Sequence, residues 1–182
     1  SFYGWYWPDE AQINPHFTPE YMTYATTLTK RARALTPKAK ILIAPYGTRL
    51  VKPDDVYLRQ VDAMDVDIMA YQDEIGVQKT RIEELPRIFE GLRKVHDRAV
   101  KAKLWADVEI FEFEAKPYRS PVHAAPFERV LQQMTAVSPY VDEILIYQYI
   151  GLVNKPGTKA MAGRGPASTA FYTDYAHWRA VR

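Results

Sequence analysis

The chain has 182 residues, of which 47% are hydrophobic and 25% charged, a balance typical of a folded globular domain and not of a disordered segment. Its 24 basic and 22 acidic residues give a net charge of +2 and are spread along the sequence, so the charge pattern does not predict binding to nucleic acid or anionic lipid. The chain has no cysteine, which excludes disulfides and cysteine-ligated metal sites, and no apolar run reaches the roughly 18 residues of a membrane span.

Five short strand-like segments organise the sequence, and each is followed by a polar or Gly- and Pro-containing loop and then by a helical pattern. The predicted strands cover residues 2–7, 41–45, 66–72, 103–111 and 143–149. The predicted helices are one capped by Thr18 that ends near residues 36–37, one over residues 54–64, a long one capped by Thr80, one over residues 126–137, and a last one that ends at Arg182. The aromatic segment 2–7 has the pattern of a buried strand.

Strands that alternate with helices predict an α/β fold with a parallel sheet, because parallel neighbours need crossover connections. No glycine-rich phosphate-binding motif follows a strand, which argues against a nucleotide-binding doubly wound sheet. Carboxylates, amides and aromatics follow the strands instead, where (β/α)₈ TIM barrels keep their active sites. At about 36 residues per unit, eight units need roughly 290 residues. We therefore expect residues 1–182 to form one partial barrel domain of five βα units, with about three N-terminal units supplied by an upstream segment or a second chain.

The fourth predicted strand carries two carboxylates on one face. Strand side chains alternate, so Trp105, Asp107 and Glu109 point to one side, and the apolar residues between them suit packing against helices. Carboxylates that point inward are costly unless they are paired, hydrogen-bonded or exposed to a solvated cleft, and the end of a barrel strand favours the cleft. Glu109 is the stronger functional candidate, whereas Asp107 is equally consistent with a structural role. Glu112 and Glu114 are expected in a solvated loop.

Aromatic residues precede two carboxylates in the sequence G-W-Y-W-P-D-E at residues 4–10. Aromatic rings offer flat apolar faces that stack on sugar rings, while carboxylates bind hydroxyl groups and transfer protons. The segment therefore predicts a carbohydrate site in which Trp5, Trp7 and Asp9 bind substrate and Glu10 takes part in the chemistry. A core position is an equally good interpretation of Trp5.

Two other predicted strands end in Tyr followed by Gln, and an amide at such a place can read hydroxyl groups or simply join neighbouring strands. The candidate substrate-binding residues at these strand ends and at the end of the second strand are Tyr46, Tyr71, Gln72, Asp73, Glu74, Gln148 and Tyr149. The four histidines lack metal-ligand spacing and no G-x-S-x-G motif is present. We therefore expect neither a metal ion or other cofactor nor a serine hydrolase.

Four segments carry a resemblance to a known family. They are F-Y-G-W-Y-W-P-D-E at residues 2–10, I-L-I-A-P-Y at 41–46, D-I-M-A-Y-Q-D-E-I-G at 67–76 and W-A-D-V-E-I-F at 105–111. Together they resemble the glycoside-hydrolase-like barrels of bacterial exported proteins classed as domain of unknown function 4434. The resemblance implies a (β/α)₈ glycosidase fold in which the units here are the fourth to eighth, and a periplasmic or secreted location.

The resemblance also implies roles for two residues. Many retaining glycosidases on this fold place the acid/base Glu after the fourth strand and the nucleophile Glu at the end of the seventh, which are the positions of Glu10 and Glu109. Those enzymes commonly have Asn before the acid/base Glu, where this chain has Asp9. The leading hypothesis is a glycoside hydrolase that acts on a poly- or oligosaccharide through these two carboxylates, and the alternative is a barrel that binds glycans without catalysis.

Overall fold

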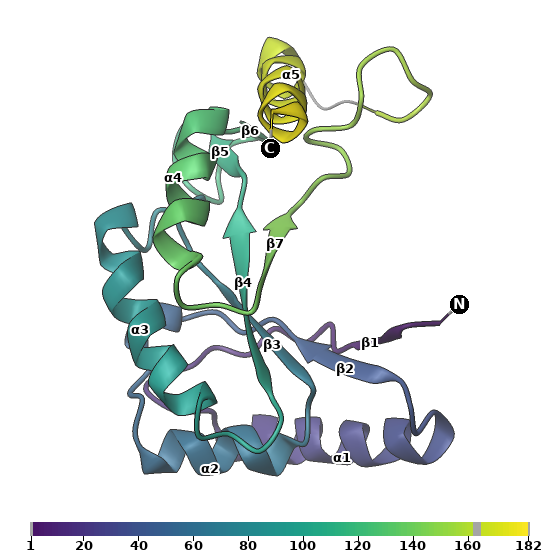
Figure 1. The fold of residues 1–182 in the computed structure, drawn as a ribbon, viewed down its shortest axis with the longest axis vertical. Helices are drawn as coiled ribbons and strands as arrows, with labels where there is room; N and C mark the ends of the chain where they lie inside the picture. The colour runs from purple at the N-terminus through teal and green to yellow at the C-terminus, as the bar shows by residue number, and fades with distance from the viewer. Residues whose placement is uncertain (1, 162–164, 182) are drawn as a thin grey trace.

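A curled sheet of five parallel strands forms the centre of the structure, a computed structural model that describes residues 2–161 and 165–181. The strands stand in the order β1-β2-β3-β4-β7, and the direction of the strands turns steadily from one edge to the other (Figure 1). Their bounds are β1 Gly4–Tyr6, β2 Lys40–Ile43, β3 Ile68–Gln72, β4 Lys103–Glu109 and β7 Glu143–Tyr147. The predicted α/β class with parallel strands in chain order is therefore confirmed.

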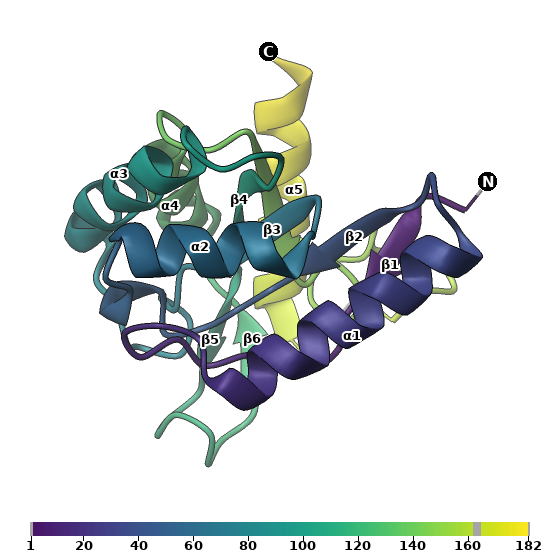
Figure 2. The ribbon, with the colours of Figure 1, turned by 90° about the horizontal axis from the view of Figure 1, so that it is seen from below.

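Helices connect the strands and lie along the outer side of the curl (Figures 1 and 2). They are α1 Pro19–Leu35, α2 Asp55–Met64, α3 Leu85–His96 and α4 Phe127–Val137, with short 3-10 turns at Thr48–Leu50 and Ile82–Glu84. A fifth helix, α5 Gly165–Ala180, packs Phe171 and Trp178 against Phe127 of α4 with ring centroids 5.5 and 5.8 Å apart. Because α1 to α4 cover one side of the sheet, its concave side is left to polar side chains and loops.

Alternation along the strands builds the core between sheet and helices. Leu104, Ala106 and Val108 of β4 are fully buried because every second side chain points to the outer helices. They meet the apolar stripe of α3, in which Phe89 and Leu92 are also buried. Apolar residues at every second position of β4 therefore face apolar residues at helical spacing on α3, and the contact between them forms the core layer between sheet and helices.

The sequence predicted the residues that cap two helices, and the structure agrees with one of these predictions and differs from the other. Thr18 caps α1 as predicted, since its Oγ1 accepts a hydrogen bond from Tyr21 N at 3.2 Å. The predicted cap at Thr80 is wrong. The 3-10 turn Ile82–Glu84 precedes α3, which starts at Leu85 because Pro86 suits the first turn of a helix.

Predicted bounds of elements near the two ends of the chain also differ from the structure. β1 covers only Gly4–Tyr6, and Phe2 and Tyr3 are 61% and 68% exposed, so the prediction of a buried strand there is wrong, because β1 is an edge strand paired with β2 alone. The fifth predicted strand ends at Tyr147 and not at Tyr149. The last helix is described to Ala180, and its predicted end at Arg182 lies outside the described residues.

The fourth predicted strand divides after Glu109. Its last part forms β5 (Phe111–Phe113), which pairs antiparallel with β6 (Val122–Ala124). Glu112 therefore lies in a strand and not in a solvated loop, with Oε1 3.7 Å from Arg129 Nε. The paired residues of this hairpin are 9 to 13 positions apart in the chain, and a pattern of one strand followed by one helix does not predict such a pairing.

Candidate active site

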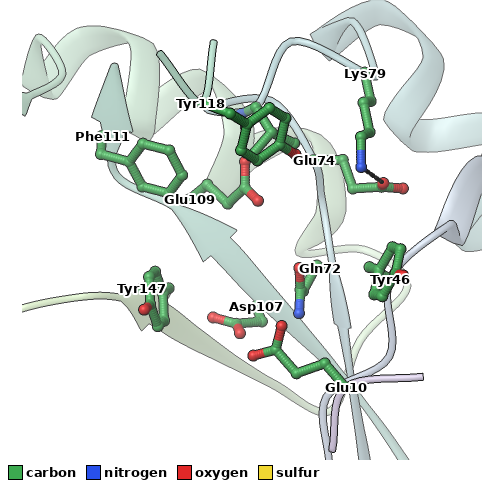
Figure 3. Close-up of a pocket in the computed structure, with 11 residues that line it drawn as sticks. Glu10, Tyr46, Gln72, Glu74, Lys79, Asp107, Glu109, Phe111, Tyr118 and Tyr147 are labelled. Carbon is green, nitrogen blue, oxygen red and sulfur yellow. Dashed lines mark hydrogen bonds and ion pairs between the residues drawn. The ribbon is translucent and has the colours of Figure 1, made fainter. Parts of the chain in front are cut away.

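A pocket of about 370 Å³ lies at the C-terminal ends of the parallel strands (Figure 3). The side chains that line it are Glu10, Tyr46, Gln72, Glu74, Val77, Lys79, Asp107, Glu109, Phe111, Tyr118 and Tyr147. Six of them are sequence candidates from four separate segments, namely Glu10, Tyr46, Gln72, Glu74, Asp107 and Glu109. Four carboxylates, three tyrosines and one lysine thus share a single cavity.

Strand register places the two β4 carboxylates in this pocket. Asp107 stands beside Gln72 of β3, and Glu109 stands opposite Tyr147 of β7. Both carboxylates lie on the face of β4 away from the helices, while Val108 between them is fully buried on the other face. The carboxyl groups are therefore separated along one strand and enter the pocket at different depths (Figure 3).

The backbone of Glu109 is held by side chains from a loop and a helix. Its N–H donates to Asp73 Oδ1 at 3.1 Å, and its carbonyl accepts from Gln133 Nε2 at 3.2 Å and from Arg129 Nη2 at 2.9 Å. Gln133 Nε2 also donates to Asp73 Oδ2 at 2.6 Å. Arg129 and Gln133 are four residues apart on α4 and so share one face of that helix. Asp73 and α4 together fix the end of β4 and with it the start of the Glu109 side chain.

The loop after β3 holds the carboxyl group of Glu109. Val77 N donates to Glu109 Oε2 at 2.8 Å. Gly76 passes directly beside the side chain, since a Cβ at this position would lie 3.0 Å from Glu109 Oε2 and 2.8 Å from the carbonyl oxygen of Phe111. Only glycine lets the backbone approach this closely, so the loop fits around one position of the Glu109 carboxylate.

Burial and neighbouring negative charges raise the pKa of two carboxyl groups in the pocket, Asp107 and Glu109. Burial, followed by the negative charges of Asp73 and Glu10, raises the pKa of Asp107 to about 7. Burial and the charge of Asp73 raise the pKa of Glu109 to about 8, against the hydrogen bond from Val77 N, which lowers it. The pKa values of Asp107 and Glu109 thus both lie close to neutral pH, and that of Glu109 is the higher.

Glu10 approaches the pocket from the segment after β1. Its Oε1 accepts a hydrogen bond from Tyr6 OH at 3.2 Å, and its carboxyl group and that of Asp107 point toward each other (Figure 3). The segment is held in place by Ile13 N, which donates to Tyr46 O at 2.9 Å. Glu109 lies on the other side of the pocket, so Asp107 stands closer to Glu10 than Glu109 does (Figure 3).

Lys79 closes one side of the pocket. Its Nζ lies 3.9 Å from Glu74 Oε1, 5.2 Å from the centroid of the Tyr46 ring and 5.6 Å from that of Tyr118. A cation over aromatic rings is attracted by their negative faces. Lys79 therefore joins the loop after β3 to the end of β2 and to the segment between β5 and β6.

Several sequence candidates lie outside the pocket. Trp5 and Trp7 stack at 6.2 Å and donate hydrogen bonds to Thr36 Oγ1 and Thr29 Oγ1 of the α1 region. Both rings therefore contact the α1 side of β1 and not the concave side. Asp9 is exposed, and its negative charge, after burial, raises the pKa of Tyr21 in α1.

Three further candidates are placed elsewhere. Asp73 is buried beneath the pocket and holds the backbone of Glu109, so it contacts the site without lining it. Gln148 lines a neighbouring hollow, and Tyr149 lines another together with Tyr175 and Arg179 of α5. The pocket instead has Tyr147 from the same strand end.

Tyr71 is fully buried on the helix side of β3. Its hydroxyl group lies 2.7 Å from Tyr57 OH and 3.0 Å from His96 Nε2, and His96 Nδ1 lies 2.8 Å from the carbonyl of Ala102. Burial lowers the pKa of His96 to about 4, so the imidazole is neutral at pH 7 and can pair with hydroxyl groups. This network joins β3 to α2 and α3.

We expect Tyr71→Phe to lower the free energy of unfolding by about 1–3 kcal/mol, because it leaves two buried polar groups without a partner. Chemical denaturation monitored by circular dichroism measures the loss. Tyr3→Phe is the matched control, since Tyr3 is 68% exposed, and it should change stability by less than about 0.5 kcal/mol. An equal effect of both substitutions would contradict the structural role of Tyr71.

Sequence reasoning missed five residues of the pocket: Val77, Lys79, Phe111, Tyr118 and Tyr147. It also missed Tyr6, which binds Glu10. Tyr6 was detectable from alternation, because the face of β1 opposite Trp5 and Trp7 must be the concave one. No local signal marks Lys79 or Tyr118, which reach the pocket from loops.

No group of three or more His, Asp or Glu side chains in residues 2–161 and 165–181 is arranged to hold a metal ion. Over the same residues, no helix is long and apolar enough to cross a bilayer.

Two solved structures whose descriptions name glycosidases share the fold. A protein provisionally described as an α-L-fucosidase from Bacteroides thetaiotaomicron superposes with a TM-score of 0.76 and 16% identity, over 100% of this chain and 56% of that chain. A β-D-glucuronidase from Dictyoglomus thermophilum superposes with a TM-score of 0.51 and 12% identity, over 96% of this chain and 32% of that chain. The chain thus spans about half of the first and a third of the second, and the likeness is one of fold.

No curated protein sequence matches the chain. The sequence model of a family described as domain of unknown function (DUF4434) matches residues 1–160. This range includes every residue that lines the pocket, and it confirms the family resemblance seen in the sequence. The chain therefore belongs to the DUF4434 family.

Proposed function

We propose that the pocket is the active site of a glycoside hydrolase. The observation that carries this function is one cavity at the strand ends in which Glu10, Asp107 and Glu109 stand among tyrosine rings. Glycosidases need a proton donor and a carboxylate on either side of the bond that breaks. Glu10 and Glu109 lie on opposite sides of this pocket (Figure 3), and the two glycosidase-named structures of the same fold support the assignment.

In the proposed reaction Glu109 is the nucleophile and Glu10 the acid and base. A Glu109 oxygen bonds to the anomeric carbon while the bond from that carbon to the leaving oxygen breaks, and the proton of Glu10 passes to the leaving oxygen. Water then attacks the anomeric carbon, gives its proton to Glu10 and releases Glu109. Each step conserves charge, and Glu10 ends the cycle protonated as it began.

The carboxyl group of Glu109 must be ionised when it attacks the anomeric carbon. Val77 N donates to Glu109 Oε2, and a donor of this kind stabilises a carboxylate anion. Burial nevertheless raises the pKa of Glu109 to about 8, above the pKa of about 7 of Asp107, so Glu109 must lose its proton before it can attack.

Glycan binding without catalysis is the weaker proposal. A site that only binds glycans would use aromatic side chains such as the sequence candidates Trp5, Trp7, Tyr71 and Tyr149, and none of these four lines the pocket. The pocket's aromatics are Tyr46, Phe111, Tyr118 and Tyr147, which surround carboxylates. An aromatic wall beside an acid pair is expected of a catalytic site more than of a purely binding one.

We also propose that the curled sheet is the second part of a (β/α)₈ barrel, with β1 and β7 as its fourth and eighth strands. Support comes from the strand order and from the longer fucosidase-named chain, of which this chain covers 56%. The first three units would pair with β1 and β7 and close the pocket. An upstream segment is the proposed source of these units.

A screen of the longest available chain against aryl glycosides and a polysaccharide panel tests the function. We expect the wild type to release a reducing sugar. Proton NMR then identifies the anomer that forms first. The anomer keeps its configuration if Glu109 attacks directly. Binding of glycans in the same panel without any hydrolysis would favour the non-catalytic alternative.

We expect Gly76→Ala to lower kcat by about 10–100-fold, because the added methyl group displaces the Glu109 carboxylate from its position. Gly91→Ala is the matched control. Its Cβ in α3 would lie 3.4 Å from Pro53 Cγ, and alanine favours a helix, so activity should stay at the wild-type level. Equal kcat values for both variants would show that the loop around Glu109 does not position it.

A further inference from the structure

A second hollow of about 650 Å³ adjoins the acidic pocket, the cavity lined by Glu10, Glu74, Asp107 and Glu109. Val77, Phe111, Tyr118 and Tyr147 line both cavities, so the two meet along a common wall. The second hollow, here called the apolar groove, continues along Phe113, Pro121 and Val122 of the hairpin and Gln148, Leu152 and Met161 after β7. A molecule held by its sugar in the acidic pocket can therefore extend into the groove.

A row of aromatic rings runs from the acidic pocket into the groove. Tyr147 meets Phe111 at 6.3 Å between ring centroids, Phe111 meets Phe113 at 5.8 Å, and Phe113 meets Tyr118 at 5.5 Å. Alternation in β5 places Phe111 and Phe113 on one face, while Glu112 between them points to Arg129. The hairpin that follows Glu109 thus presents its apolar face to the groove.

The polarity of the groove decides what fits it. Among the residues that the structure describes, the side chains that line it carry no charge, and the polar groups are the amide of Gln148 and the hydroxyls of Tyr118 and Tyr147. A sugar has a hydroxyl on nearly every carbon, and each one needs a partner when it leaves water. A flat apolar ring loses no hydrogen bond on entering, and it covers apolar surface that is otherwise exposed.

We propose that the apolar groove binds the leaving part of the substrate and that this part is an apolar aromatic aglycone. The proposal rests on the function proposed above, since it takes the sugar to lie in the acidic pocket. The substrate class is then the aryl glycosides. Val122, which is 39% exposed and lines only the groove, lies in the predicted contact surface without supporting the core.

The test compares Val122→Asp with a matched substitution at a surface valine far from the groove. Val100 is 84% exposed and follows α3 at the opposite end of the strands, so Val100→Asp adds the same charge without touching either cavity. Val122→Ile keeps the apolar wall. Two quantities are measured on the longest available chain: the Kd of free naphthol, a neutral flat ring, and KM for naphthyl and methyl glycosides of one sugar.

We expect Val122→Asp to raise both the Kd of naphthol and KM of the naphthyl glycoside about tenfold, a loss of about 1.4 kcal/mol in binding. KM of the methyl glycoside should not change. Val100→Asp and Val122→Ile should match the wild type in all three measurements.

Other results separate the two proposals. Hydrolysis of glycosides without naphthol binding, or with equal effects of Val122→Asp on naphthyl and methyl glycosides, would overturn the groove and leave the hydrolase standing. Naphthol binding that Val122→Asp abolishes, in a protein that hydrolyses no glycoside, would keep the groove and overturn the hydrolase. Self-association of the protein that Val122→Asp disrupts would assign the groove to a second copy of the chain and would overturn the aglycone proposal. Displacement of naphthol by oligosaccharides would assign the groove to a further sugar and would overturn it as well.

Discussion

Replacing Glu109 with Gln should lower kcat by at least about 10³-fold, because the amide cannot bond to the anomeric carbon and the first step then has no nucleophile. The substitution changes one carboxyl oxygen to an amide group and keeps the size of the side chain. Val77 N can still donate to the remaining oxygen, as it does to Glu109 Oε2 at 2.8 Å. The fold should therefore persist while the chemistry stops, which circular dichroism and steady-state kinetics check together.

Glu10→Gln should give a different result, which depends on the leaving group. An acid is needed to protonate a poor leaving oxygen, whereas an activated aryl oxygen departs without a proton. We expect a loss of about 10²–10⁴-fold on unactivated glycosides and a much smaller loss on activated aryl glycosides. The comparison is made by kcat/KM over a series of leaving groups with one sugar.

Glu112→Gln is the matched control for both substitutions. Glu112 is close in sequence to Glu109 but points toward Arg129 and does not line the pocket, so its loss should leave kcat within about twofold of the wild type. Equal and mild losses in the Glu10 and Glu109 variants would show that both residues bind substrate without acting on it. A complete loss of activity in the Asp107→Asn variant, together with an active Glu109→Gln variant, would identify Asp107 as the nucleophile in place of Glu109.

The second large effect concerns stability as a function of pH. Burial raises the pKa of Asp73 to about 6. Burial together with neighbouring negative charges raises the pKa of Asp107 to about 7 and that of Glu109 to about 8. Carboxyl groups of an unfolded chain titrate near pH 4. Between these values the folded protein holds more protons than the unfolded one. Stability is then fully present below about pH 4 as far as these groups are concerned, and it is lost as pH rises through 6 to 8.

We therefore expect the midpoint of thermal unfolding to fall between pH 5.5 and pH 8.5. Each pH unit across which one group is protonated only in the folded state costs about 1.4 kcal/mol, so the sum is a few kcal/mol. Differential scanning calorimetry over this range measures it. A midpoint that stays level or rises would contradict the buried acid cluster.

Asp107→Asn removes one member of the cluster and should make the protein more stable at pH 8.5 while it lowers activity. The gain should shrink toward pH 5.5, where Asp107 is protonated and resembles the amide in charge. Asp174→Asn is the matched control, because Asp174 lies exposed on α5 and should change the midpoint little at either pH. Equal gains for both variants would mean that total charge, and not the pocket, sets the pH dependence.

Residues near the first strand show how far local patterns reach. The sequence places Glu10 at a strand end next to aromatics, and the structure brings it into the pocket with Tyr6. Trp5 and Trp7 were candidates because of their chemistry alone, yet alternation puts them on the α1 side. The residue types of the segment predicted that it contributes to the site, and the alternation of side chains along the strand decided which of them reach the pocket.

By itself the sequence determined the order of strands and helices, the common face of Asp107 and Glu109, and the position of Glu10 after a strand, because these depend on spacing along one segment. Only the tertiary structure decided that Tyr147 faces Glu109, that Lys79 and Tyr118 close the pocket, and that a hairpin follows β4. These features depend on the register between strands and on loops that meet far from one another in the chain. Such pairings are set by packing over the whole domain, which no local pattern contains.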